Sequence, residues 1–447
     1  ADFPEKIIDD FGTLERKVNG LMALAFNKKN GKFEQKEIIS VIRAPAPQHT
    51  IKIKTKTGRV FSSSPDHRML IFSEGKIVNK KILEIGTNDR LLIPEKIQFD
   101  DVDIQEIDLL LEFRKINGIS KDVCVRGVCK SVKICIHTLG GLKSASQKTI
   151  INKKTLSNYI YRDSVPLNIL ELLLKLSGND WTLISKECRL GFKRNFANIP
   201  RIVKIDKYFM RLLGYYLSEG YARSIAKSCY QVSMSSEEKD LNEDMLYCIK
   251  NVFGIKSNRS KGVIVIPNRA VYHFFVDVLK LGKGAKSKRI PYIFTSLSKP
   301  KIKELLSAYF SGDGSVEKNR LHVSCSSVSE KLLRDIGLQL LRFGIVYTMK
   351  TETREPTGIA KVFYDKKVKT PVFMLNYLSI RSAYARKFFD EIGFFSARKN
   401  LALKNCLKIE KAPHLKTFEG LVLDEIKEKE ISLSNNQYLY DIEVKDY

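Results

Sequence analysis

The sequence predicts an α+β protein in which a β-rich domain, divided between the two ends of the chain, encloses an insert of helices and strands. Three observations support this fold class. The chain has 447 residues, enough for several domains of about 100–200 residues each. Short alternating strand-like segments occur near both ends. The middle of the chain contains an internal repeat, which is typical of two similar halves.

The β-rich domain is predicted for residues 1–98 and 415–447. Residues 49–60 (HTIKIKTKTGRV) alternate apolar and basic side chains and then turn at Thr57 and Gly58. The last strand-like segment, residues 437–444 (QYLYDIEV), returns to the same pattern. Because the two ends resemble each other and the middle differs, we expect one domain that is interrupted by an insertion.

Residues 99–204 are predicted to be a helical region. Residues 148–167 (KTIINKKTLSNYIYRDSVPL) resemble a helix-turn-helix unit. Thr155 is expected to cap a short basic helix that exposes Ser157 and Asn158, short polar side chains that can contact a DNA groove. The alternative is a plain helical linker.

The repeat occupies two predicted halves, residues 205–300 and 301–414. Its shared features are an apolar helix ending in acid-Gly, a strand with a Ser-rich turn, and a helix ending in Phe-Gly-Ile. Glu219 and Asp313 are 94 residues apart, and the two Phe-Gly-Ile triplets are 90 apart. The apolar helices carry small residues four positions apart: Gly214 and Ser218 in the first half, Ala308 and Gly312 in the second.

Residues four apart lie on one helix face, so these small residues allow two helix backbones to approach closely. Glu219 and Asp313 would then meet at the same end. Two carboxylates at helix C-termini repel each other, and each also opposes the helix dipole by about 0.3–1 kcal/mol. A bound Mg²⁺ relieves both costs and can act on a phosphodiester. The alternative is a pair of ordinary core helices that terminate at acid-Gly.

The charge balance favours a polyanionic partner. The chain has 77 basic and 50 acidic residues, a net charge of +27 that is spread along its length. Nucleic acid is the first expectation for such a field. The alternative is the lysine-rich surface of a thermophile protein, but such surfaces usually have a higher content of Glu as well as of Lys.

Membrane insertion and a zinc site are not expected. A membrane span needs about 20 consecutive apolar residues, and the sequence has none. Eight cysteines suit a reducing compartment, so we expect a cytoplasmic protein. Cys124, Cys129, Cys135 and His137 lie close together, but their spacings differ from those of zinc knuckles and ribbons. Small buried hydrophobic side chains are the favoured interpretation of these cysteines.

The segments LLGYYLSEG and LLSAYFSGDG resemble the two dodecapeptide motifs of LAGLIDADG homing endonucleases. The resemblance implies two αββαββα halves, each with a sheet in the DNA major groove. It also implies a monomer that cuts both strands of double-stranded DNA at a long asymmetric site with Mg²⁺. Glu219 and Asp313 become the catalytic acids that bind the metal. Base contacts are expected from residues 349–354 (MKTETR) and 362–369 (VFYDKKVK).

The same resemblance implies catalytic lysines. The family places a lysine before Ile-Pro upstream of the second acid, and Lys288 fits within residues 283–291 (KGAKSKRIP). Its basic neighbours Lys286 and Arg289 are expected to contact DNA. For the second half, Lys369 is the candidate.

Residues 58–72 (GRVFSSSPDHRMLIF) resemble an intein block with a Thr-x-x-His core, represented here by Ser64 and His67. Asp441 in YDIEV resembles the acidic position of the C-terminal intein block. This resemblance implies a Hint (hedgehog/intein) splicing domain with host protein exteins as partners. Residues 41–58 resemble inteins of the archaeal DNA polymerase II large subunit.

An intein begins with Cys or Ser and ends in His-Asn, whereas this sequence begins at Ala1 and stops at Tyr447. We therefore expect splicing only from a longer parent chain. A nuclease-dead nucleic-acid-binding relative, such as an intron maturase or a regulator, is one alternative, but the acids at positions 219 and 313 argue against it. A hedgehog-like autoprocessing module is another, but it would lack the endonuclease pair.

Overall fold

The computed structural model describes residues 5–27, 30, 32–98, 100–193, 197–225, 229–260, 262–355, 372–409 and 415–445. The chain forms two compact units. Unit 1 comprises Ala1–Asp101, Ser315–Glu391 and Leu401–Tyr447, and unit 2 comprises Val102–Gly314 and Ile392–Asn400. The predicted α+β class is confirmed. These units divide the chain differently from the four predicted domains, whose boundaries stay predictions.

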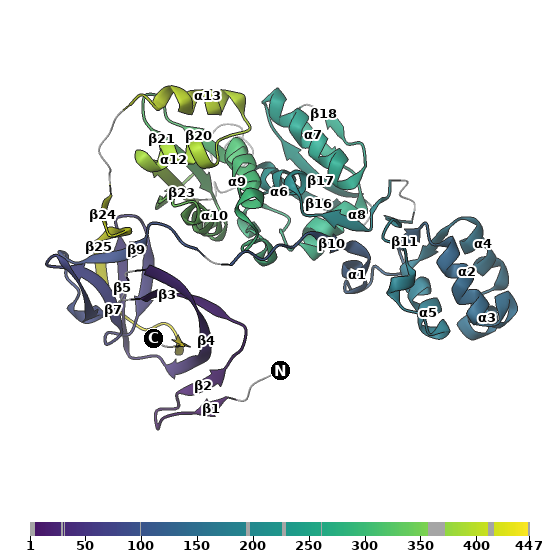
Figure 1. Ribbon diagram of the computed structural model, residues 1–447, viewed down its shortest axis with the longest axis horizontal. Helices are drawn as coiled ribbons and strands as arrows, with labels where there is room; N and C mark the ends of the chain where they lie inside the picture. The colour runs from purple at the N-terminus through teal and green to yellow at the C-terminus, as the bar shows by residue number, and fades with distance from the viewer. Residues whose placement is uncertain are drawn as a thin grey trace. The chain divides into compact units, whose positions relative to one another are not determined.

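In unit 1, segments from both ends of the chain pair in two antiparallel sheets (Figure 1). A seven-stranded sheet has the order β6-β5-β25-β9-β7-β8, with β24 paired to β25. A five-stranded sheet has the order β1-β2-β4-β26, with β3 paired to β4. The strands are β1 Lys6–Ile7, β2 Leu14–Lys17, β3 Met22–Asn27, β4 Lys32–Pro45, β5 His49–Thr55, β6 Val60–Ser63, β7 Arg68–Ser73, β8 Lys76–Lys81, β9 Arg90–Pro94, β24 Lys416–Phe418, β25 Leu421–Leu433 and β26 Tyr438–Val444, with a short helix η1 at Ile82–Glu84.

The alternation of residues 49–55 explains the core of the seven-stranded sheet. Side chains of a strand point to opposite faces in turn, so Ile51 and Ile53 face inward and are fully buried, whereas Lys52 is exposed. They pack with Ile71, Ile82, Ile85, Leu91 and Ile426, the last of which comes from the C-terminal part of the chain. Apolar burial therefore holds the two ends of the chain together.

Unit 1 also contains most of the second repeat. Its elements are β20 Gly314–Val316, β21 His322–Ser327, α10 Glu330–Arg342, β22 Thr348–Arg354, β23 Phe373–Arg381 and α12 Ala383–Glu391. The amide of Met349 in β22 donates to the carbonyl of Thr57 (2.7 Å), and the amide of Ile97 donates to Leu341 O (3.1 Å). These contacts between the β-rich part and the second repeat explain why one compact unit holds both.

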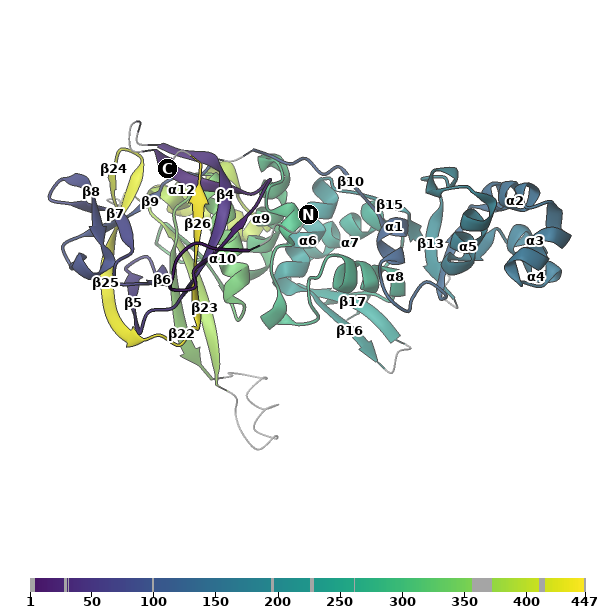
Figure 2. The same ribbon diagram turned by 90° about the horizontal axis from the view of Figure 1, so that it is seen from below.

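The two repeats have the same connectivity, which confirms the predicted αββαββα halves. The first comprises α6 Lys207–Glu219, β16 Tyr221–Ile225, β17 Cys229–Ser235, α7 Lys239–Phe253, β18 Asn258–Ser260, β19 Val263–Ile266 and α8 Arg269–His273, which continues as the π-helix Phe274–Val278. Its sheet order is β16-β17-β19-β18, and that of the second repeat is β20-β21-β23-β22. In Figure 2, α6 and α9 (Lys299–Asp313) lie next to each other, and Figure 1 shows the same neighbourhood.

Residues 102–204 contain more than the predicted helices. The helices are α1 Leu109–Arg114, α2 Cys129–Thr138, α3 Gly141–Thr149, α4 Lys153–Tyr161, α5 Leu167–Ser177 and the short η2 Trp181–Leu183. The strands are β10 Glu106–Asp108, β11 Val123–Arg126, β12 Ser164–Pro166, β13 Arg189–Phe192, β14 Ile199–Pro200 and β15 Ile202–Lys204. Four of them form the sheet β12-β11-β13-β14, and β10 pairs β15. The sequence analysis missed these strands because each has only two to four residues, too few to show an alternating pattern.

The prediction that Thr155 caps α4 is wrong. Asn152 is the cap, and its side chain accepts a hydrogen bond from the amide of Lys154 (2.8 Å). The helix therefore begins before Thr155, which lies within its first turn. Asparagine is a strong N-cap residue, so its position decides where the helix starts. Within the described residues, no helix has both the length and the apolar character that a membrane span requires.

Candidate active site

Helices α6 and α9 pack through the four predicted small residues. A Cβ added to Gly214 would lie 2.4 Å from Leu305 O and 2.8 Å from the Cβ of Ala308. A Cβ added to Gly312 would lie 2.3 Å from Ser218 Oγ. Such distances are below any real contact, so a larger side chain at either glycine requires the helices to separate.

The same contact brings the two predicted acids together. Glu219 and Asp313 are the last residues of α6 and α9. The Cγ of Glu219 lies 3.1 Å from the position of an added Cβ on Gly312, the neighbour of Asp313. The negative charge of Glu219 also acts on Asp313: burial and this charge raise the pKa of Asp313 to about 7. Burial likewise raises the pKa of Glu219.

Each acid has a buried lysine beside it. The ammonium of Lys288 donates to Ser218 O (2.9 Å), the carbonyl that precedes Glu219. The ammonium of Lys399 donates to Ser311 O (2.6 Å) and to Gly312 O (2.7 Å), the carbonyl that precedes Asp313. Burial lowers the pKa of Lys288 to about 8 and also lowers that of Lys399. We call Glu219, Asp313, Lys288 and Lys399 the acid–lysine cluster.

Lys399 was missed in the sequence analysis, which named Lys369 for the second half. Lys369 lies outside the described residues. The signal for Lys399 is a further stretch of the repeat: Leu281-Gly282 and Ile392-Gly393 each precede a lysine, six residues after the glycine. Both glycines adopt positive φ, +78° at Gly282 and +69° at Gly393. This left-handed conformation favours glycine, so the pair marks equivalent turns in the two halves.

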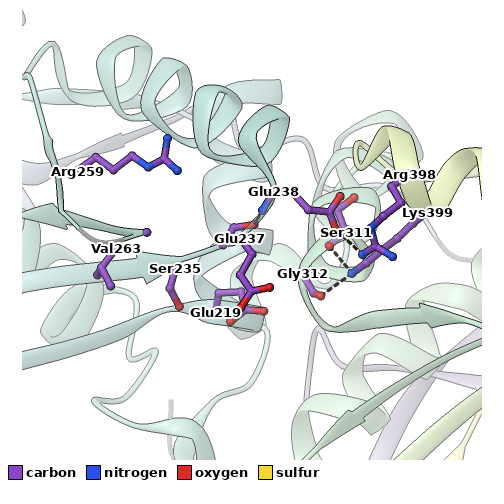
Figure 3. Close-up of a pocket in the computed structure, with 12 residues that line it drawn as sticks. Glu219, Ser235, Glu237, Glu238, Arg259, Val263, Ser311, Gly312, Arg398 and Lys399 are labelled. Atoms are coloured by element: carbon purple, nitrogen blue, oxygen red, sulfur yellow. Dashed lines mark hydrogen bonds and ion pairs between the residues drawn. The ribbon is translucent and has the colours of Figure 1, made fainter.

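A pocket of about 880 Å³ opens beside the cluster. Figure 3 shows Lys399 directed at the carbonyls of Ser311 and Gly312, and Glu238 close to Arg398. The wall also includes Glu219, Ser235, Ser236, Glu237, Arg259, Gly262 and Val263. Space next to paired carboxylates can admit a divalent cation and a phosphate. The two acids fit such an ion because they offer hard oxygen ligands. Burial is the main cause of their raised pKa values, and a bound cation would favour their charged forms.

The remaining predicted nucleic-acid contacts are on the surface. Lys286 and Arg289 are exposed on either side of the buried Lys288. On α4, Asn158 is exposed and Ser157 and Thr155 are partly buried. Residues 349–354 lie within β22, and residues 362–369 are outside the described residues.

The predicted splicing residues belong to two different sheets of unit 1. His67 is exposed and directly precedes β7, where its amide donates to Ser64 O (3.2 Å). Asp441 is in β26, opposite Ile42 of β4, and its carboxylate accepts from the amide of Ile442 (2.8 Å). Their role in splicing stays a prediction.

The cysteines do not form a metal site in the described part of the chain. Cys124 and Cys135 are buried, Cys129 is partly buried, and all three are free thiols. Among the described residues, no group of three or more His, Cys, Asp or Glu side chains is arranged to hold a metal ion. The burial of Cys124 and Cys135 agrees with their interpretation as small core residues.

Comparison with known proteins identifies the repeat. Residues 206–275 and 300–393 match the family described as the LAGLIDADG-like domain. These segments contain both acids, all of α6 and all of α9 except its first residue, Lys299. The chain therefore carries a LAGLIDADG-like domain, as the two motifs predicted.

The most informative relatives are archaeal DNA polymerases. The chain is 33% identical to the DNA polymerase II large subunit of Thermococcus kodakarensis over 398 residues, which is 87% of this chain and 21% of the relative. It is 24% identical to the same subunit of Haloquadratum walsbyi, covering 81% of this chain and 17% of that protein. A DNA polymerase of Thermococcus litoralis is 24% identical, covering 99% of this chain and 29% of the relative. The chain thus spans less than a third of the length of each of these relatives.

Solved structures with partial similarity belong to two kinds. The crystal structure of I-DmoI in complex with DNA and Ca covers 42% of this chain and 90% of its own, with 13% identity and a TM-score of 0.30. The solution structure of the Pab PolII intein covers 20% of this chain and 50% of its own, with 26% identity and a TM-score of 0.19.

Proposed function

We propose that this chain is an intein-borne homing endonuclease that cuts both strands of double-stranded DNA at a long asymmetric site and requires Mg²⁺. The observation that carries this proposal is the acid–lysine cluster: two carboxylates at the ends of closely packed helices, each with a buried lysine on the preceding carbonyl. The LAGLIDADG-like domain match and the net charge of +27 support it.

In this proposal, each residue of the cluster has a defined task. Glu219 and Asp313 hold the divalent cation, which would polarise the phosphodiester and activate water when bound. Their mutual repulsion makes the pair ready to exchange a proton for a cation. Lys288 and Lys399 keep their ammonium groups beside the acids, where they can offset phosphate charge or orient a water. Because the cluster is repeated, one lysine serves each strand.

The test is cleavage of a host gene for the archaeal DNA polymerase II large subunit that lacks the segment encoding this chain. The wild-type protein is expected to cut this DNA with Mg²⁺. Glu219→Gln and Asp313→Asn are expected to bind the same DNA and leave it intact, because amides are poor ligands for Mg²⁺. Undiminished cutting by both variants would refute the assigned site.

The β-rich part of unit 1 supports a second proposal, which concerns protein splicing. We propose that it is the splicing scaffold. Ser64 and His67 belong to its Thr-x-x-His-like block and Asp441 to its C-terminal block, and the host protein is a DNA polymerase II large subunit. The 33% identity to that subunit over 87% of this chain supports the host. We also propose a monomeric, cytoplasmic enzyme, which agrees with its eight free cysteines. Extein ligation from a longer chain, and its loss in His67→Ala, tests the scaffold.

A further inference from the structure

Hydrogen bonds fix the segment that carries Lys399 to α9 and to the first repeat. The hydroxyl of Ser311 in α9 accepts from the amides of Phe395 (2.8 Å) and Ser396 (3.3 Å). Asp240 accepts from the amide of Ala397 (3.0 Å). The chain around Lys399 is therefore tied both to the active-site helix and to α7.

Glu238 makes the central contacts of this attachment. One oxygen of its carboxylate accepts from Arg398 (2.6 Å), and the other accepts from the hydroxyl of Ser396. The Ser396 oxygen in turn accepts from the backbone amide of Lys399 (3.1 Å). The hydroxyl of Ser396 donates its hydrogen bond to Glu238, so the lone pairs of the hydroxyl oxygen can accept from the amide of Lys399. Glu238 therefore orients the backbone of Lys399 through the Ser396 hydroxyl.

The position of Glu238 in the repeat shows that it is not a helix cap. Glu238 precedes α7 and makes no side-chain hydrogen bond to the start of that helix. The matching residue of the second repeat, Ser329, does cap α10 by accepting from the amide of Leu332 (3.2 Å). Glu238 thus occupies a position that suits a serine cap, but its carboxylate contacts the segment of Lys399 instead of the start of α7.

The attachment is also specific to one lysine. Lys399 is the sixth residue after Gly393, and Lys288 is the sixth after Gly282, so Ser396 corresponds to Ala285. Alanine has no hydroxyl and Ser329 has no carboxylate, so these two residues cannot make the contact that Glu238 makes with Ser396. Of the charges around Lys399, that of Glu238 has the largest effect in raising its pKa against the effect of burial.

We propose that Glu238 is a positioning residue that acts through Ser396 to hold Lys399 on the carbonyls of Ser311 and Gly312. The catalytic consequence of this inference rests on the proposed endonuclease function. Glu238 contacts the segment of Lys399, so the two halves should depend on Glu238 unequally. Loss of Glu238 should therefore impair one half and spare the other.

The structural part of the proposal is tested without DNA or metal. Lysine acetylation by a water-soluble amine reagent, followed residue by residue with mass spectrometry, reports how well each ammonium is protected. In the wild type, Lys288 and Lys399 should both react slowly, because both are buried and hydrogen-bonded. In Glu238→Ala the reactivity of Lys399 should rise about tenfold or more while Lys288 stays protected, which also shows that the helix pair is still folded. An unchanged Lys399 overturns the proposal.

The catalytic part is tested by following each DNA strand separately. Glu238→Ala should slow one strand by about tenfold or more, so that nicked DNA accumulates, and the slow strand should be the one slowed by Lys399→Met. Ser396→Ala should show the same strand bias, and Glu238→Gln, which keeps a hydrogen-bond acceptor, a smaller one. The matched control is Glu243→Gln, which changes an exposed acid of α7, the helix that follows Glu238. This variant should cut both strands as the wild type does. Equal slowing of both strands contradicts the assignment. If the wild type cuts no DNA, the endonuclease proposal fails, while the acetylation result still decides the role of Glu238.

Discussion

At the scale of single residues, the acid–lysine cluster is an unfavourable arrangement that only its surroundings maintain. Two carboxyl groups lie together at helix C-termini, and burial opposes the charged form of all four side chains. Titratable groups whose pKa values are shifted this strongly by their environment are typical of functional sites. The cluster therefore leads to predictions on pH dependence and on the two lysines.

Stability without divalent cations should depend on the protonation of Asp313. The pKa of an Asp carboxyl is ordinarily about 3.9, and that of Asp313 is about 7 in the folded protein. Between these pH values the folded state therefore holds more protons than the unfolded state. The free energy of unfolding should therefore fall as pH rises from about 4 to 7, by at most about 1.4 kcal/mol per pH unit for one proton. Urea unfolding at a series of pH values measures this slope. Asp313→Asn should make it shallower, and a slope that is the same in both proteins contradicts the prediction.

The two lysines should serve different strands. Replacement of Lys288 or Lys399 by Met removes the ammonium but keeps an unbranched apolar chain in the buried position. Each variant should slow cleavage of one strand about 10²-fold, and the two variants should affect opposite strands. Strand-specific end labels on one DNA substrate measure both rates together. If both variants slow the same strand, the two lysines do not have equivalent roles in the repeat.

At the scale of elements, the contact between α6 and α9 determines whether the cluster exists at all. The helices end at acid-Gly, and the glycines that follow, Gly220 and Gly314, are extended rather than left-handed. Their requirement is close approach: an added Cβ on Gly314 would lie 2.2 Å from Phe310 O. This contact is with the preceding helix itself, so Gly220 and Gly314 allow the tight exit of the chain from α6 and α9, whereas Gly214 and Gly312 let the two helices approach and the two acids meet.

A larger side chain at the helix crossing should be destabilising. Gly214→Val places methyl groups against Leu305 O and Ala308, and overpacking of this kind costs about 1–3 kcal/mol. Denaturant unfolding measures the loss. Gly284→Val is the matched control, because an added Cβ there meets nothing within 4 Å and the backbone is extended. Equal stability of Gly214→Val and the control would mean that the helix pair tolerates separation.

At the scale of the whole molecule, much of the positive charge lies in parts of the chain outside the acid–lysine cluster. The segment that contains α2, α3 and α4 carries eight Lys and Arg residues between positions 126 and 162 and has no Asp or Glu there. We expect this segment to hold DNA through phosphates and to contribute to affinity rather than to chemistry.

Salt dependence tests that division of tasks. Removal of the two charges at the start of α4, with Lys153→Gln and Lys154→Gln together, should reduce the slope of log affinity against log salt by about 2. The cutting rate at saturating DNA should stay unchanged. The same change at Lys52 and Lys76, exposed lysines of the seven-stranded sheet, gives the effect of a lower net charge alone. An equal loss of slope in both double variants argues against a specific contact by α4.

Much of this architecture can be predicted from the sequence because its signals are local. The motif helices, the two acids and the four small residues depend on helical spacing, and the strands of residues 49–55 depend on alternation. The short strands β11–β14 and the cap of α4 at Asn152 escaped prediction, since two to four residues show no period and several polar residues compete for one cap.

The sequence by itself determined that two similar halves, each with an acid after an apolar helix, belong to a basic chain with a LAGLIDADG-like domain. Only the tertiary structure decided that Lys399 accompanies Asp313 and that Glu238 supports it. The physical reason is distance along the chain: Lys399 follows Asp313 by 86 residues and Glu238 by 161. Contacts over such separations follow from packing, and the local pattern around each residue does not encode its partner.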